Sequence, residues 1–109
     1  MPTSKEYRDL ILDKLDSLEN ISYKSMMGEY LLYYNQILFG GIYDNRLLIK
    51  IVEKNKDYNL KEAIPYKNAK PMYFIKDIED KKFLKEIIID TCKSLKSNNK
   101  KKKNKKYLE

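Results

Sequence analysis

The chain has 109 residues and a formal net charge of +7, a size that fits one domain with a single core. It contains no histidine and one cysteine, Cys92, which excludes an internal disulfide and histidine-based catalysis and argues against a zinc site. No stretch approaches the roughly 20 apolar residues that span a bilayer, and the first residues lack the apolar run of a secretory signal. We therefore expect a cytoplasmic protein with no membrane contact, no metal and no other cofactor.

The first predicted element is a helix over about residues 4–18. Thr3-Ser4-Lys5-Glu6 fits a capping box in which Thr3 is the N-cap and Glu6 reaches back to it. Apolar residues follow at helical spacing. They are Tyr7, Leu10, Ile11, Leu15 and Leu18.

Four antiparallel strands are predicted next, over residues 21–27, 30–34, 37–43 and 46–52, because these runs are rich in aromatic and β-branched residues. The pairs Asn35-Gln36 and Asp44-Asn45 separate the last three runs. Both pairs suit two-residue hairpin turns, since Asn and Asp tolerate the positive φ that such turns need. The pattern predicts a β-meander.

The second half of the chain predicts one more strand between two helices. Residues 53–57 are polar and break the strand pattern, and residues 59–64 predict a short helix that must stop before Pro65. Residues 72–75 predict a fifth strand, and a last helix is predicted from near Asp77 to near Ser97. Its buried stripe consists of Phe83, Leu84, Ile87, Ile88, Cys92 and Leu95.

These elements predict an α+β fold with a single domain. Its antiparallel five-stranded sheet combines the β-meander with one later strand, and the N- and C-terminal helices pack on one face of the sheet. The domain is predicted to span residues 1–96. Residues 97–109 carry too little apolar surface to offset the entropy of ordering them, so we predict a disordered Lys-rich tail.

Period-two alternation divides the meander into two faces if the hairpins pair Tyr34 with Ile37 and Tyr43 with Arg46. The face predicted to lie under the helices is apolar: Leu31, Tyr33, Leu38, Gly40, Ile42, Leu47, Ile49 and Ile51. The opposite face mixes aromatic and apolar residues with two cations. Six residues of this opposite face are predicted to contact a partner, and we call them the predicted interaction face: Tyr30, Tyr34, Phe39, Tyr43, Arg46 and Lys50.

Three interpretations of that interaction face stay open. Other parts of the chain could cover it, a protein could bind it, for example in a symmetric homodimer, or it could contact a small molecule or a nucleic acid. The small-molecule interpretation requires a concave site lined by Tyr30, Phe39 and Lys50.

The positive charge lies at the C-terminal end. Residues 1–92 hold 15 Lys and Arg against 15 Asp and Glu, so the whole excess of +7 comes from residues 93–109. A run of lysines attracts any polyanion in a salt-dependent way. The predicted polyanion contact is Lys100, Lys101, Lys102, Lys103, Lys105 and Lys106.

Catalytic chemistry is not indicated by the remaining residues. Cys92 lies on the apolar stripe of the last helix without a nearby base in the sequence, which favours a buried small side chain over a reactive thiol. Acidic residues such as Glu79 and Asp80 are explained by the start of that helix. The glycines do not form a phosphate-binding loop. We predict that the protein is not an enzyme.

Three segments together resemble the TfoX/Sxy N-terminal domain family: residues 26–33, residues 38–50, and Tyr66 with residues 69–72. Many members of that family read Met-Phe-Gly-Gly-Tyr where this chain has Met26-Met27-Gly28-Glu29-Tyr30. The resemblance implies an α+β fold and no catalytic residue. It also implies a regulatory role, since the named members control bacterial competence for DNA uptake by acting on transcription with a cyclic-AMP receptor protein.

We therefore expect a stand-alone family member in which the Lys-rich tail takes the place of the second, helical domain of those regulators. The expected function is that of a regulatory or interaction module that acts by protein contact, with a homodimer as one possible form. The alternative is a nucleic-acid-associated accessory protein that uses the tail.

Overall fold

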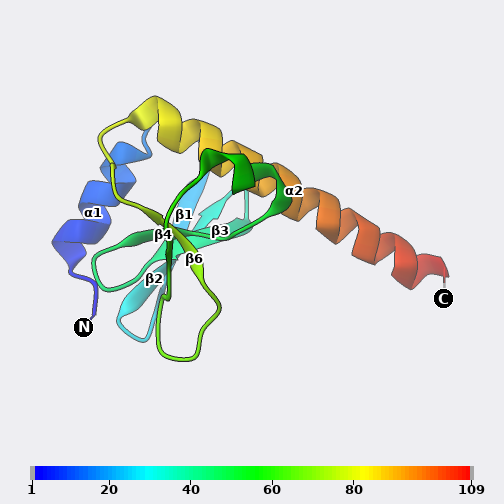
Figure 1. Ribbon diagram of the computed structural model, residues 1–109, viewed down its shortest axis with the longest axis horizontal. Coiled ribbons are helices and arrows are strands. Elements are labelled where there is room, and N and C mark those ends of the chain that lie inside the picture. Colours follow the sequence, from blue (N-terminus) through cyan, green and yellow to red (C-terminus); the bar gives the residue numbers. More distant parts are fainter. Residues whose placement is uncertain (1, 109) are drawn as a thin grey trace.

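The computed structural model places two helices on one face of a six-stranded antiparallel sheet, among the residues that it describes (Figure 1). It describes the chain from residue 2 to 108, and the side chains of residues 2–96. The strands lie in the order β1-β2-β3-β4-β6-β5. They are β1 (Ile21–Met26), β2 (Glu29–Tyr34), β3 (Ile37–Ile42), β4 (Leu47–Ile49), β5 (Glu62–Ala63) and β6 (Met72–Ile75). The helices are α1 (Lys5–Lys14), the 3₁₀ helix η1 (Glu53–Tyr58) and α2 (Lys81–Leu108).

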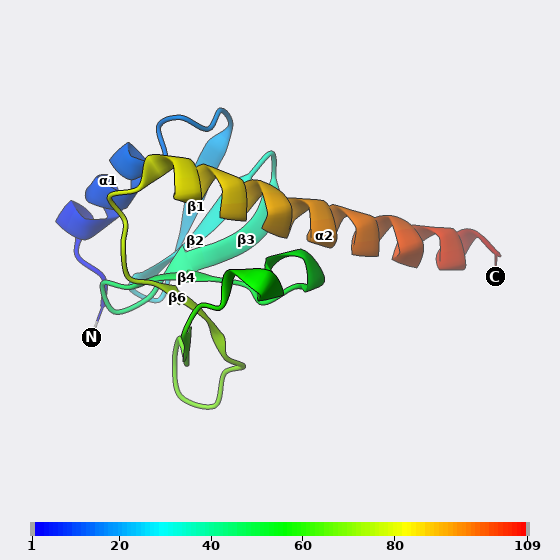
Figure 2. The same ribbon diagram turned by 45° about the horizontal axis from the view of Figure 1, so that its top comes forward.

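The predicted α+β class is confirmed, with the two-residue strand β5 added to the five expected strands. Figure 2 shows α1 and α2 above the sheet, while the loop between β5 and β6 lies on the other side. No helix in the described part of the chain is both long and apolar enough to cross a membrane.

The cap of α1 is Ser4, one residue later than predicted, because Ser4 Oγ accepts a hydrogen bond of 3.1 Å from the Tyr7 N–H. The helix ends at Lys14 instead of Leu18. Leu15 and Leu18 are nevertheless buried in the core, so the predicted apolar positions hold although the last turn is not helical.

Thr3, the residue predicted to cap α1, instead joins a polar cluster around the Glu29 carboxylate. Glu29 Oε1 accepts from the Thr3 hydroxyl at 2.7 Å, the Thr3 N–H at 3.0 Å and the Asp44 N–H at 3.1 Å. The Asn45 N–H donates to Thr3 Oγ1 at 3.1 Å. These bonds fasten the N-terminal segment to the start of β2 and to the β3–β4 turn.

Both predicted hairpin turns are confirmed. Tyr34 pairs with Ile37, and Tyr43 and Arg46 exchange two backbone hydrogen bonds of 2.9 and 3.0 Å. The four turn residues Asn35, Gln36, Asp44 and Asn45 all have positive φ, between 49° and 66°. This is the left-handed conformation at both central positions that two-residue hairpins require.

A β-bulge in β3 makes part of the predicted face assignment wrong. Leu32 pairs with Gly40 and Tyr33 pairs with Leu38, so Phe39 is an extra residue between them. The phase of alternation therefore changes within β3, and the residues before the bulge point opposite to the prediction. Strand β4 and the end of β3 follow the prediction.

The core lies between the sheet and the two helices. Its sheet residues include Tyr30, Leu32 and Phe39, which were predicted to face away from the helices, together with Ile42, Leu47, Ile49 and Ile75. Leu31 and Leu38, which were predicted to be buried, are only half-buried on the opposite face. The stripe on α2 is confirmed, since Leu84, Ile87, Ile88 and Cys92 are buried and Phe83 and Leu95 pack at the edge of the core.

The predicted helix over residues 59–64 is wrong. The helical turn is η1, which lies in the polar run before it, and residues 62–63 form β5 beside β6. The buried Asn55 explains this turn, because its Oδ1 accepts from the Val52 N–H at 3.0 Å and its Nδ2 donates to the Lys50 carbonyl at 2.8 Å and to Thr91 Oγ1 at 2.9 Å. Asn59 then ends η1 with a φ of 56°.

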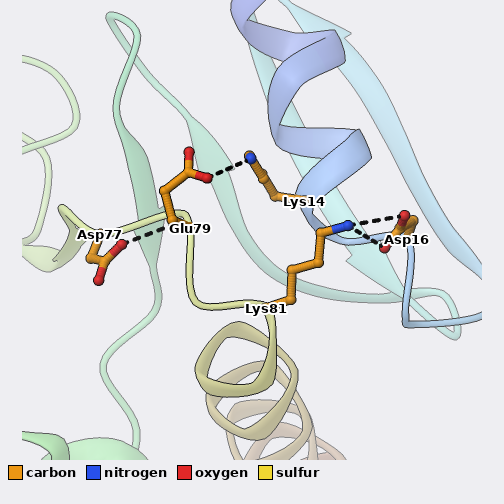
Figure 3. Close-up of polar contacts among 5 residues, drawn as sticks. All are labelled: Lys14, Asp16, Asp77, Glu79 and Lys81. Atoms are coloured by element: carbon orange, nitrogen blue, oxygen red, sulfur yellow. Dashed lines mark hydrogen bonds and ion pairs between the residues drawn. The ribbon is translucent and has the colours of Figure 1, made fainter.

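The start of α2 is at Lys81, later than the predicted Asp77, and ion pairs connect this region to the end of α1 (Figure 3). Lys14 Nζ lies 2.7 Å from Glu79 Oε2, and Lys81 Nζ lies 3.2 Å from Asp16 Oδ1. The carboxylate of each pair is exposed to solvent, so these pairs contribute little to stability.

The structure continues α2 to Leu108, beyond the predicted end near Ser97. Lysine is a good helix former, which accounts for a helical backbone in this segment. Figure 2 shows this end of α2 extending past the sheet. The side chains of residues 97–109 lie outside the described part of the chain, so the domain boundary at residue 96 and the separate Lys-rich tail remain predictions.

We expect the substitution Asn55→Ala to lower the free energy of unfolding by about 2 kcal/mol, because it leaves the Val52 N–H and the Lys50 carbonyl without their partner in a buried site. Urea unfolding followed by circular dichroism measures this change. The control is Lys56→Ala in the same 3₁₀ helix, where the side chain is exposed and the expected change is within about 0.5 kcal/mol. Equal stability of the two variants would contradict the role assigned to Asn55.

Candidate functional site

The six residues of the predicted interaction face do not form one surface. Phe39 is fully buried, and Tyr30 is 8% exposed in the same core beneath the helices. The Tyr30 ring packs edge-on against Tyr23, and the Arg8 guanidinium lies 5.3 Å from the Tyr30 ring centre. Both residues were predicted to lie on the interaction face. The bulge at Phe39 changes the alternation of the strand, and their side chains instead belong to the core.

The other four residues are divided between the core edge and the opposite side of the sheet. Tyr34 is partly buried against the core cluster. Tyr43 is 5% exposed, but its ring packs against Tyr66 with the ring centres 6.0 Å apart. Arg46 and Lys50 are both half-buried, and they contribute to the site described below.

The loop over residues 64–71, which we call the β5–β6 loop, extends on the side of the sheet away from α1 and α2 (Figure 2). Arg46 holds it there: its Nη2 donates to the Ile64 carbonyl at 3.1 Å, and its Nε donates to the Tyr43 carbonyl at 3.1 Å. The Tyr43–Tyr66 ring contact fastens the same loop to the sheet. Arg46, predicted to face a partner, therefore positions this loop.

Beside this loop lies an open cavity of about 840 Å³, which we call the apolar groove. Its floor includes the strand residues Met26, Leu31 and Leu38, and the β5–β6 loop provides a wall. The full lining is Met26, Leu31, Leu38, Gly40, Tyr43, Lys50, Ile51, Val52, Pro65, Tyr66, Ala69, Lys70, Pro71, Met72 and Leu95. This is a concave site on the face that was predicted to hold a small molecule. Of the three residues expected to line it, Lys50 does so, whereas Tyr30 and Phe39 are buried in the core on the other face.

Large apolar side chains are exposed at the groove and next to it. Met26 is 37% exposed and Tyr66 is 58% exposed, and both line the groove. The neighbouring residues Met27 and Ile64 are 97% and 47% exposed. Grouped exposed apolar residues of this kind are typical of an interaction surface.

The charges at the groove are of one sign. Among the residues whose side chains are described, its lining includes Lys50 and Lys70 but no Asp or Glu. Glu29 approaches the end of the groove at Tyr43, and its carboxylate there is bound by the N–H and O–H groups around Thr3. Burial, followed by the nearby Tyr66, Glu29 and Tyr33, raises the pKa of Tyr43, so this phenol stays neutral at physiological pH.

Catalytic groups are not gathered at this groove. Within the described residues, no group of three or more Cys, Asp or Glu side chains is arranged to hold a metal ion. Cys92 is buried in the core on the other side of the sheet. The absence of enzyme activity and of cofactors remains a prediction. The six lysines of the predicted polyanion contact lie outside the described side chains, so this contact is also still a prediction.

The signal that could have located the groove was the glycine pair in β3. A Cβ added at Gly40 would lie 2.2 Å from the Leu48 carbonyl oxygen, and one at Gly41 would lie 2.7 Å from the Tyr43 ring. Two adjacent glycines in a strand indicate a bulge or a close backbone approach. Interpreting this pair as a bulge would have placed Leu31 and Leu38 on the free face.

Comparison with known proteins gives one finding. A family model described as the TfoX N-terminal domain matches residues 13–93, which is most of the chain. No curated protein matches the chain. The matched residues include the whole sheet, the β5–β6 loop and all of the groove lining except Leu95.

We expect Cys92 to be unreactive in the folded protein, because burial raises the pKa of its thiol to about 11 and leaves it 4% exposed. Reaction with Ellman's reagent at pH 8 should be at least 100-fold slower in buffer than in 8 M urea. The unfolded thiol ionises near its ordinary pKa of 9.0 and the folded thiol does not, so this group should also lower stability as the pH rises from 9 to 11. Equal reaction rates in buffer and urea would contradict the burial of Cys92.

Proposed function

The chain belongs to the TfoX N-terminal domain family, and from this premise we propose that it is a cytoplasmic, non-enzymatic regulatory module that acts by protein contact. The contact surface is the apolar groove on the helix-free face of the sheet. The resemblance to competence regulators supports a role in controlling the transcription of DNA-uptake genes.

The observation that carries this proposal is an apolar groove next to exposed apolar side chains on an otherwise small domain. Isolated monomers rarely leave a contiguous apolar area larger than a few hundred Å² open to water. Two residues of the lining, Met26 and Met72, are methionines, whose flexible thioether side chains adapt to varied partner surfaces. The described residues of the lining include no Asp, Glu or Cys side chain, and an apolar lining of this kind supports binding.

The groove is also held in a defined shape. Arg46 bonds the β5–β6 loop to the β3–β4 turn, and the Tyr43 ring packs over Gly41. A preformed surface loses less conformational entropy when a partner binds, which supports specific recognition.

A double variant of two exposed groove residues, Met26→Ser with Tyr66→Ser, tests this function. We expect at least a fivefold lower transcriptional response of DNA-uptake genes in the natural host, because the variant removes apolar contact area without opening the core. A reporter gene measures the response, and immunoblotting checks that protein levels are equal.

The matched control is Tyr23→Ser. Tyr23 is 41% exposed, similar to Met26, but it lies on β1 opposite Leu32 and contacts Tyr30, on the helix side of the sheet. This control should keep the full response. If both variants lose the response equally, or if both keep it, the groove is not the surface that binds the partner.

A second candidate function, association with nucleic acid, is supported by the charge excess of +7 in residues 93–109. Replacing Lys100, Lys101, Lys102, Lys103, Lys105 and Lys106 by Gln should abolish salt-dependent binding to a 30-base-pair DNA duplex. Fluorescence anisotropy at several salt concentrations measures this binding. For the unmodified protein, the plot of log affinity against log salt concentration should have a slope of about −0.9 for each phosphate contact, and for the six-lysine variant the slope should approach zero. The control variant, Lys82→Gln with Lys85→Gln, alters two exposed lysines of α2 and should keep most of the binding. An unchanged salt slope in the six-lysine variant would exclude the tail as the binding element.

A further inference from the structure

We infer that the partner segment recognised by the apolar groove combines apolar side chains with carboxylates; this inference rests on the proposed function and specifies the partner's chemistry. The apolar part of the segment fills the space above Leu31, Leu38 and Met72. Its carboxylates reach the ammonium groups of Lys50 and Lys70.

The charge of the groove selects this partner. Lys50 and Lys70 belong to the lining, which has no acidic residue, and neither lysine forms an ion pair with a carboxylate among the described residues. The chain from residue 64 to 76, which contains the loop and β6, carries three lysines and no Asp or Glu. On β1, Lys24 pairs with Leu31 and so stands on the same face of the sheet as the groove floor. Charge complementarity of this kind favours an acidic partner and speeds its association.

The carboxylate nearest to the groove is not paired with these two lysines. Glu29 lies close to Tyr43 at one end, and its oxygens accept from Thr3 and from the Asp44 N–H, at distances from 2.7 to 3.2 Å. It is thus occupied by the bonds that fasten the N-terminal segment. The side chains available to an incoming segment are apolar or cationic.

The size of the groove limits the partner to a short segment. A volume of about 840 Å³ falls in the range of roughly 300–1,000 Å³ that is typical of ligand-sized sites. Such a space accommodates a few side chains of one strand or one helical turn. Phosphate-rich nucleic acid is disfavoured here because most of the lining is apolar. A dimer in which two copies pair their grooves is disfavoured, because Lys50 and Lys70 of each copy would face the same cations of the other.

Three synthetic peptides of 12 residues, each labelled with fluorescein, test the inference with the full 109-residue protein. The first alternates Leu with Glu, the second alternates Leu with Lys, and the third alternates Ser with Glu. Fluorescence anisotropy at 50 and 200 mM NaCl gives the dissociation constants. We expect the Leu–Glu peptide to bind at least tenfold more tightly than either of the others.

The decisive variant is Lys50→Glu with Lys70→Glu, which should weaken binding of the Leu–Glu peptide at least tenfold and improve binding of the Leu–Lys peptide. The matched control is Lys82→Glu with Lys85→Glu, on exposed positions of α2. It changes the net charge by the same amount and leaves the C-terminal lysines in place. This control should bind the Leu–Glu peptide as the unmodified protein does.

Several results would overturn the inference. Equal binding of the Leu–Glu and Ser–Glu peptides would mean that charge alone attracts them, as expected if the C-terminal lysines act. An equal loss in the two double variants would mean that net charge and not the groove decides. Sedimentation of the unmodified protein as a dimer that Lys50→Glu with Lys70→Glu dissociates would make a second copy the occupant. Circular dichroism identifies a variant that has unfolded, and Lys50→Gln with Lys70→Gln then replaces it with the same expected direction.

Failure of the inference can be distinguished from failure of the proposed function. If the peptides show no preference but the Met26→Ser and Tyr66→Ser variant still loses its transcriptional response, the groove binds a partner of different chemistry. If that response is also retained, the protein-contact function itself is wrong.

Discussion

The extra residue in β3 is the constraint on which the arrangement of this domain depends. Phe39 is inserted between the pairs Leu32–Gly40 and Tyr33–Leu38, and it is fully buried. The next two residues are glycines, because a Cβ at Gly40 would collide with the Leu48 carbonyl oxygen and one at Gly41 with the Tyr30 carbonyl oxygen and the Tyr43 ring. Because of the bulge, residues of β3 before and after the extra residue both point into the core, and the hairpin turns at the two ends of the strand are unchanged.

The bulge sorts the aromatic residues of the sheet between two layers. Tyr30 and Phe39 pack under α1 and α2, where they supply a large part of the apolar surface that a small domain needs. Tyr43 remains on the opposite side, where it packs against Tyr66 of the β5–β6 loop. The helix-free face is thus partly covered by one loop, and the apolar groove is the part that this loop leaves open.

Two polar clusters, one around Glu29 and one around Asn55, fasten loop segments to the sheet and the helices. Glu29 gathers hydrogen bonds from the N-terminal segment and the β3–β4 turn, while Asn55 connects the chain after β4 to α2 through Thr91. Buried polar groups stabilise a fold when all of their partners are present, and no buried side-chain nitrogen or oxygen among the described residues is left without one. The family match over residues 13–93 includes Glu29, Asn55 and all of the groove lining except Leu95.

The sequence by itself determined the first helix, the four strands of the meander, the later strand over residues 72–75, the two hairpin turns and the buried stripe of α2. These features depend on neighbours within a few residues: Asn and Asp tolerate a positive φ, and apolar residues recur at the helical period. The tertiary structure alone decided which side of the meander is core, where the turn at Asn55 forms and where the β5–β6 loop lies. Those outcomes depend on contacts between residues far apart in the chain, such as Asn55 with Thr91 and Arg46 with Ile64. A single inserted residue reverses the alternation of everything before it, so a pattern read in steps of two could not locate the groove.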